Sequence, residues 1–327
     1  MKVLKPKGGR RRLVTKLLVV IMAATGTITA TGAGAAQAAT YPGDVTWSRY
    51  VTTMNMYTMG CNQGKSSDSL GQPHQMVLLN FGDPGWETYG TWGAWDTTAG
   101  GFETNGAIES AVKSYMQGFY DCTVFDSNSF LTVAPGVTNS GSGINSSAAN
   151  ALGTAWGNMI KDLNSWIVSK GMQYQITTFG ALDVEPAWGP YSYSQAWATG
   201  FMASNLNYYD FGSADGCPTS GTGSCYTGWT QADVYQLAWG NSTAIGVPQI
   251  YSTTQAQQWA AISAWGKAHA SAGPILWAAA LSQYQACKDQ GSPCSTVDNT
   301  PLQSWQQLTA DSGTAPYYST EMSYASS

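Results

Sequence analysis

Apolar runs alternate with segments of helical periodicity along most of this chain. The apolar runs are short and bounded by Gly, Pro, Asn or Asp, a pattern that predicts buried strands. Their alternation with helices is typical of a parallel sheet, and eight of them are the number of a closed (β/α)8 barrel. The predicted strands cover residues 51–57, 75–81, 131–135, 175–185, 207–211, 234–239, 246–252 and 274–280.

Helical periodicity is clearest over residues 146–170, where large apolar side chains recur every three or four positions. Gly171 supplies the expected end of that helix. A second stripe begins after Thr253 or Thr254, either of which can cap the helix. Weaker helical segments cover residues 108–116 and 193–206, and residues 301–308 are expected to form a closing helix with Pro301 near its first turn.

The connection between the sixth and seventh predicted strands is too short. Residues 240–245 alone separate them, whereas a parallel crossover normally needs a dozen or more residues. Pro248 also lies inside the seventh predicted strand, where it cannot donate a ladder hydrogen bond. We therefore expect either an irregular barrel at this point or a wrong assignment of one of these two strands.

The first 38 residues have the pattern of a secretory signal peptide. A basic segment precedes an apolar one, and Ala36-Gln37-Ala38 matches the small-residue cleavage signal. We therefore expect residues 39–327 to form a single barrel domain that is secreted and extracellular, with no membrane association after cleavage.

The charge distribution narrows the choice of partners. Half of the 14 Lys and Arg residues lie in the leader, whereas all 19 Asp and Glu residues lie beyond it. A strongly acidic mature chain disfavours nucleic acid and anionic membranes. We expect a monomer whose partner is a polysaccharide or cell-wall glycan.

Six cysteines in an exported chain predict disulfide bonds. Two pairs flank short loops, so local pairing is the simplest arrangement and leaves the two remaining cysteines for each other. A zinc site is disfavoured because His74 and His269 are far from any C-x-x-C spacing. The expected pairs are Cys217–Cys225, Cys287–Cys294 and Cys61–Cys122, and no metal or organic cofactor is expected.

The candidate chemistry lies in Asp183-Val184-Glu185-Pro186, at the end of the fourth predicted strand. Positions i and i+2 of a strand share a face, with Cα atoms about 6.6 Å apart. Pro186 should end the strand. In a barrel of this type, chemistry is found at the carboxyl ends of the strands. Two acids in this position meet the requirements of acid/base catalysis on a glycosidic bond.

We expect the two acids of the D-x-E segment to differ in proton affinity. Crowding by a second carboxyl raises a pKa, so we expect Glu185 to act as general acid while Asp183 stays ionised and supports it. Asp83, after the second strand, is a third candidate catalytic acid, and Asp210, near the end of the fifth, a substrate-binding one. A retaining, inverting or substrate-assisted course is left open, as is a purely structural role as a helix cap or ion-pair partner.

Aromatic side chains near these acids are candidate sugar platforms, because apolar sugar faces stack on aromatic rings. Core packing is the alternative for each. The candidates are Trp86 in a Gly-rich loop, and Trp188 and Tyr191 after the acid pair. Tyr251 is a candidate for binding a sugar hydroxyl, and Trp277 is a further substrate-binding candidate. No nucleophile-elbow, P-loop, dinucleotide or H-E-x-x-H motif is present.

Four short segments resemble the glycoside hydrolase family 25 muramidases in the same order along the chain. They are ALDVEP, Pro248-Gln249-Ile250-Tyr251-Ser252, Ile275-Leu276-Trp277-Ala278 and Ser304-Trp305-Gln306-Gln307. The resemblance implies a barrel that cleaves the glycan of bacterial walls, with the acid role on Glu185 and the supporting role on Asp183. That family carries an Asp at the end of its first strand, which this chain lacks. LLNFGDP and YYDFGSADGCP also resemble secreted actinobacterial proteins of unassigned activity.

These features together predict a secreted glycoside hydrolase acting on peptidoglycan or another amino-sugar glycan. The alternative is a non-catalytic barrel that binds carbohydrate or cell wall.

Overall fold

A computed structural model describes residues 45–70, 74–96, 100–123, 129–141, 144–291, 293–295 and 298–324. The predicted signal peptide lies outside the described residues. Within them, no helix combines the length and apolar character needed to cross a bilayer.

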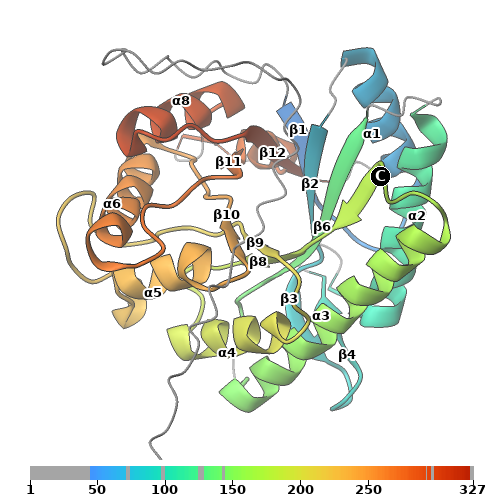
Figure 1. Ribbon diagram of the computed structural model, residues 1–327, viewed down its shortest axis with the longest axis horizontal. Coiled ribbons are helices and arrows are strands. Elements are labelled where there is room, and N and C mark those ends of the chain that lie inside the picture. The colour runs from blue at the N-terminus through green and yellow to red at the C-terminus, as the bar shows by residue number, and fades with distance from the viewer. Residues whose placement is uncertain are drawn as a thin grey trace, which may run out of the picture. The chain divides into compact units, whose positions relative to one another are not determined.

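Parallel strands form a barrel in the part of the chain from residue 45 onward (Figure 1). The strands follow the order β10-β9-β8-β6-β2-β1-β12-β11, and β7 and β8 pair with β6 in one continuous register. They are β1 (Val45–Tyr50), β2 (His74–Asn80), β6 (Phe130–Thr138), β7 (Ile176–Thr178), β8 (Gly180–Asp183), β9 (Tyr208–Asp210), β10 (Ala244–Gly246), β11 (Ala279–Ser282) and β12 (Tyr318–Tyr324).

Isolated contacts close the ring between β10 and β11. The amide of Ala278 donates to the Gly246 carbonyl, and the amide of Ile250 donates to the Leu281 carbonyl. Parallel bridges join the same two segments. With β7 and β8 counted as one, eight strands surround the axis, which confirms the expected α/β barrel of TIM type.

Helices cover the outside of the barrel (Figure 1). One apolar cluster fills the barrel interior, with Met76, Leu78 and Tyr209 among its members. A larger cluster lies between the strands and the helices, where Trp156 and Trp197 are buried. The helices are α1 (Met56–Leu70), α2 (Asn105–Cys122), α3 (Ser146–Ser169), α4 (Tyr191–Met202), α5 (Gln231–Tyr235), α6 (Thr253–His269), α7 (Tyr284–Asp289) and α8 (Pro301–Ser312).

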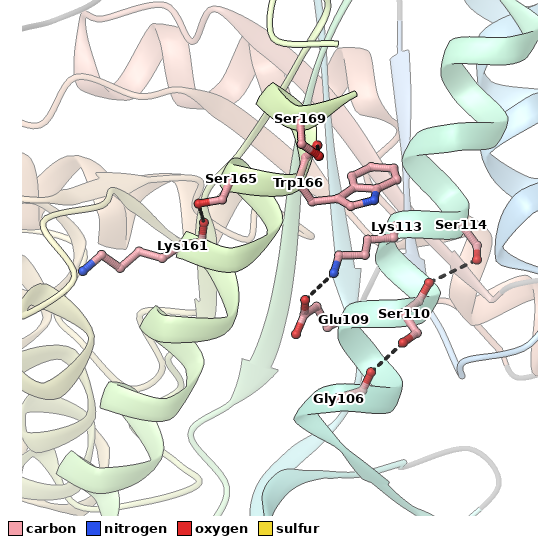
Figure 2. Close-up of polar contacts among 9 residues, drawn as sticks. All are labelled: Gly106, Glu109, Ser110, Lys113, Ser114, Lys161, Ser165, Trp166 and Ser169. Atoms are coloured by element: carbon pink, nitrogen blue, oxygen red, sulfur yellow. Dashed lines mark hydrogen bonds and ion pairs between the residues drawn. The ribbon is translucent and has the colours of Figure 1, made fainter. Parts of the chain in front are cut away.

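The outer faces of α2 and α3 satisfy their own polar groups (Figure 2). The hydroxyls of Ser110, Ser114 and Ser165 each donate to the carbonyl one helical turn earlier. Lys113 pairs with Glu109 on the same helix at 2.5 Å. These faces therefore contribute to helix stability, and the candidate chemistry lies elsewhere.

A small antiparallel sheet follows β2 at the carboxyl end of the barrel. It consists of β3 (Asp83–Trp86), β4 (Trp92–Trp95) and β5 (Phe102–Thr104). Its register places Asp83 opposite Trp95. It packs against α2 and α3, so it forms part of the wall at the end where the strands terminate.

Two of the predicted strands are wrong. Residues 51–57 lie after the first barrel strand, and α1 already begins at Met56. Residues 234–239 belong to α5 and the π-helical turn after it (Gln236–Gly240). Val234, Leu237 and Ala238 are all buried. This helical segment therefore has the same short apolar run as a buried strand. Its reassignment removes the short crossover before β10.

The sequence did not predict β1 or β12. The β12 residues Ser319, Thr320 and Glu321 form no apolar run. This strand pairs with β1 on one side and β11 on the other. Two false strands and two missed strands therefore left the expected number at eight.

Three disulfide bonds join the pairs expected from the sequence. Cys61–Cys122 links α1 to α2. Cys217–Cys225 and Cys287–Cys294 each close a short loop. Gly60 and Gly118 allow α1 and α2 to pack closely beside the first bond, because a Cβ at either position would overlap the facing backbone.

Candidate active site

The two acids of the D-x-E segment lie together at the carboxyl end of β8. The side-chain amide nitrogen of Gln249, Nε2, donates to Asp183 Oδ1 and to Glu185 Oε1, each at 2.9 Å. The two hydrogens of one amide diverge by about 120°, which places the accepting oxygens about 5 Å apart. The carboxyls therefore point to the same place, as strand alternation predicts.

Asn139, which follows β6, fixes the backbone that carries the acids. Its Oδ1 accepts from the Glu185 amide at 3.0 Å, and its Nδ2 donates to the Glu185 carbonyl at 3.1 Å. The Asn139 amide donates to the Asp183 carbonyl at 2.9 Å. The neighbouring strand end thus holds the segment in register beyond the last residue of β8.

Burial dominates the electrostatics of the pair. It raises the pKa of Asp183 well above its ordinary value, and the carboxyl of Glu185 adds to the effect. Burial raises the pKa of Glu185 to about 7, while the hydrogen bond from Gln249 lowers it and the nearby Asp215 raises it. Both carboxyls therefore favour the neutral form more than an exposed acid does. The ionised state of Asp183 beside a protonated Glu185 stays a prediction.

No cation compensates these acids within the described part of the chain, where the one ion pair is that between Glu109 and Lys113. A purely structural pair would be expected to contact Lys or Arg, because a buried charge without a partner is costly. The predicted alternative of a bridge to a basic residue is thus not what the structure contains. The described residues also include no group of three His, Cys, Asp or Glu side chains suited to a metal ion.

Tyrosines surround the acids at neighbouring strand ends. Tyr50, the last residue of β1, stacks on Tyr324 with ring centroids 4.9 Å apart, and its hydroxyl accepts from Gln283 at 2.9 Å. Burial raises the pKa of both Tyr50 and Tyr251 well above the ordinary value, and Asp183 raises them further. Tyr251 therefore lies near the pair, where the sequence placed it.

Glu185 is the outer acid of the pair. It retains 9% of its surface exposed, whereas Asp183 retains 2%. The exposed Trp188 follows three residues later. A substrate approaching from solvent would therefore meet Glu185 first.

A cavity of about 290 Å³ opens between the small sheet and the turn after β6, and neither Asp183 nor Glu185 is among its described lining residues. Asp83 lines it, and its Oδ1 accepts from the Thr138 hydroxyl at 2.5 Å. Trp86 lines the same cavity. Because Thr138 directly precedes Asn139, Asp83 and Glu185 are held by consecutive residues of one strand end. The remaining lining residues are Pro84, Gly85, Trp95, Ser140, Gly141 and Ile144.

Three other predicted binding residues have different surroundings. Trp277 is fully buried between barrel and helices, where it packs on Trp259 and donates to Ser312, so its predicted contact with sugar is wrong. Asp210 has no exposed surface, and burial raises its pKa to about 8. It could contribute only through the neighbouring acids. Tyr191 is half-buried on α4, with its ring against Trp229.

Sequence reasoning missed the residues that connect the acids. Gln249 lies within the P-Q-I-Y segment that resembles the muramidases, yet nothing in the sequence shows that its amide spans both carboxyls. Asp215 follows β9 in the loop that leads to Cys217, and it raises the pKa of both Asp183 and Glu185. A search for acids just beyond predicted strand ends could have found it.

The fold and the acid pair together define an α/β barrel with a candidate acid/base site at the carboxyl ends of its strands. No protein-family model matches the chain, and no curated protein is similar to it in sequence. Among solved structures, the endo-1,4-beta-mannanase from Rhizomucor miehei is similar over 87% of each chain, with 13% sequence identity and a TM-score of 0.39. At this TM-score the similarity says nothing about activity.

Proposed function

We propose that this protein is a secreted glycoside hydrolase that cleaves a polysaccharide by carboxylate acid/base catalysis. The observation that supports this most is the pair Asp183 and Glu185, two buried carboxyls bridged by one amide and lacking a cation among the described residues. Such an arrangement costs stability, and costs of this kind concentrate at functional sites. Three disulfides fit an extracellular protein.

Glu185 is the general acid. A pKa of about 7 leaves a substantial fraction of this carboxyl protonated near neutral pH, which is the condition for proton donation to a glycosidic oxygen. After cleavage, the resulting carboxylate can take a proton from the attacking water. Gln249 keeps the carboxyl oriented through both steps.

Asp183 supports the reaction from beneath Glu185. It comes from the same strand as Glu185, so both acids meet the substrate from one side. A classical pair flanks the glycosidic bond from two sides. One-sided acids favour a substrate-assisted course, in which the acetamide of an amino sugar attacks its own anomeric carbon and Asp183 orients that acetamide. This chemistry favours peptidoglycan or another amino-sugar glycan as the substrate class.

The test is the release of new reducing ends from purified peptidoglycan, chitin oligomers and a panel of neutral polysaccharides. We expect the wild type to cleave an amino-sugar polymer and Glu185→Gln to lose about 10²–10⁴-fold of that rate. Glu87→Gln, the same change at an exposed surface position, serves as the control and should keep full activity. Equal rates for Glu185→Gln and the wild type would exclude Glu185 as the acid.

A non-catalytic carbohydrate-binding barrel is the second candidate. The observation that favours it is burial, since Asp183 and Glu185 retain only 2% and 9% of their surface exposed. Under this alternative, the wild type binds glycan but releases no reducing ends, and Glu185→Gln leaves its affinity unchanged.

A further inference from the structure

The cavity between the small sheet and the turn after β6 has a flat aromatic wall. Asp83 and Trp95 are directly opposed across β3 and β4, and Gly85 lies on the same face. A Cβ at Gly85 would lie 3.0 Å from both Cδ1 and Nε1 of Trp95. The glycine thus lets the indole lie close against the strand. Trp95 is 41% exposed, so its ring offers an apolar surface to the cavity.

Neighbouring rings hold this wall in place. Phe102 on β5 packs against Trp95 with centroids 5.1 Å apart. Trp86 is fixed by edge contacts to Trp92 and Tyr89 at 5.6 and 5.5 Å. An aromatic platform that is ordered before binding loses little conformational entropy when a ligand stacks on it.

The Asp83 side chain lines the same cavity, and a second polar group lies behind its wall. Thr138 occupies Asp83 Oδ1, while Asp83 Oδ2 has no hydrogen-bond partner among the described residues. The Tyr193 hydroxyl is buried with no partner in the described part of the chain. It abuts Gly141 on the cavity wall, where a Cβ would lie 3.1 Å from the phenol oxygen. One aromatic face combined with acceptors and hydroxyls is the composition expected of a carbohydrate site.

We propose that this cavity, which we call the Trp95 pocket, is a binding subsite for one uncharged hexopyranose unit of the glycan. The proposal rests on the proposed function for the identity of the polymer. The cavity volume of about 290 Å³ accommodates one sugar ring rather than an extended chain. Asp83, on the cavity wall, lies close enough to Asp183 to contribute to its raised pKa. The cavity and the acid pair therefore lie at the same end of the barrel.

Charge sets the specificity of the Trp95 pocket. Asp83 lines the pocket and interacts electrostatically with Asp183, and no cation is among the described lining residues. A uronate or a phosphorylated sugar would place a second negative charge in this field and would be repelled. Neutral hexoses and N-acetylhexosamines carry no such penalty, and their hydroxyl or amide hydrogens can donate to Asp83.

The experiment measures calorimetric affinities of Glu185→Gln protein for chitohexaose, mannohexaose and hexagalacturonate, so that hydrolysis does not interfere. We expect at least one neutral hexaose to bind and hexagalacturonate to bind at least tenfold more weakly. Trp95→Ala in this background should weaken the neutral ligand about tenfold through lost stacking. Asp83→Asn, which keeps the bond to Thr138, should reduce the discrimination against hexagalacturonate.

Tyr174→Ala is the matched aromatic control. Tyr174 is 81% exposed and precedes β7, at the opposite end of the barrel, so its removal should leave all affinities unchanged. Trp95→Phe retains a ring and should retain most of the affinity, which separates stacking from misfolding.

The outcomes separate this proposal from the hydrolase proposal. Neutral-hexaose binding that depends on Trp95 supports the subsite even if the wild type releases no reducing ends. Unchanged affinity in Trp95→Ala, or no binding of any of the three probes, overturns the subsite even if the wild type cleaves glycan.

Discussion

Replacing Glu185 with Gln should stabilise the protein at alkaline pH, because the folded state holds this carboxyl in its neutral form. Burial raises the pKa from 4.5 to about 7, and each pKa unit corresponds to about 1.4 kcal/mol. The ionised carboxyl therefore costs the fold about 3 kcal/mol above pH 7. Glutamine keeps the shape and can still accept the hydrogen bond from Gln249, but it carries no charge.

The sign of the effect depends on pH. Below pH 4.5, the carboxyl is protonated in both folded and unfolded chains, so the wild type and Glu185→Gln should be equally stable. Between pH 4.5 and about 7, only the unfolded chain releases the proton, so the stability of the wild type falls as pH rises. Above pH 7, the variant should exceed the wild type by a constant margin.

Urea unfolding at pH 4, 6 and 8.5, with disulfides intact, measures this difference. Asp210 titrates in both proteins, so its effect largely cancels in the comparison. Without the Glu185 charge the pKa of Asp183 falls, which adds to the gain of the variant at alkaline pH. Glu87→Gln should show no pH-dependent gain, because Glu87 is exposed. A Glu185→Gln gain that is the same at pH 4 and pH 8.5 would refute the reasoning.

Three further changes test other parts of the structure. Gln249→Leu removes the donor that lowers the pKa of Glu185, so the alkaline limb of the pH–rate profile should move to higher pH; an unmoved limb would contradict the bridging role. Gly118→Ala places a Cβ 2.1 Å from the Tyr57 carbonyl oxygen and should cost about 2 kcal/mol or more. Gly106→Ala on the same helix meets nothing nearer than 3.9 Å and should be neutral or stabilising in urea unfolding. Replacing Cys61 and Cys122 by Ala, which opens a separation of 61 residues, should cost about 4 kcal/mol, against about 2 kcal/mol for Cys287 and Cys294, separated by 7. Equal midpoints for the two double variants would argue against the loop-entropy account.

The barrel could be predicted because its strongest segments combine several signals. The stripe of residues 146–170 became α3, which Asn145 caps and Gly171 follows in a left-handed conformation. Apolar runs became β2, β6 and β7–β8. The strand predictions failed where residue composition does not distinguish a helix from a strand. Residues 234–239 are mostly buried, so their apolar pattern fits a buried helix and a buried strand equally well. Ser319 and Thr320 of β12 are polar but buried, so their burial depends on partners distant in sequence.

Some features of the candidate site could likewise be predicted from the sequence, and others could not. Asp183 and Glu185 are two residues apart on one strand, so local geometry alone predicts that they share a face. Gln249 reaches them from a position more than sixty residues away, which only the closed barrel brings near. Trp277 was placed at the site by resemblance, but strand alternation turns it to the helix layer. The residue types in the sequence indicated which side chains could contribute to a site. The direction in which each side chain points follows only from the strand register in the folded barrel.

The most direct test of the acid role compares the loss caused by Glu185→Gln on two substrates with the same sugar. One is the natural glycan linkage, whose leaving oxygen needs a proton, and the other is an aryl glycoside whose phenolate leaves without one. The account predicts a loss of about 10²–10⁴-fold on the glycan and a much smaller loss on the aryl glycoside. Equal losses on both substrates, or no cleavage of either by the wild type, would contradict the account.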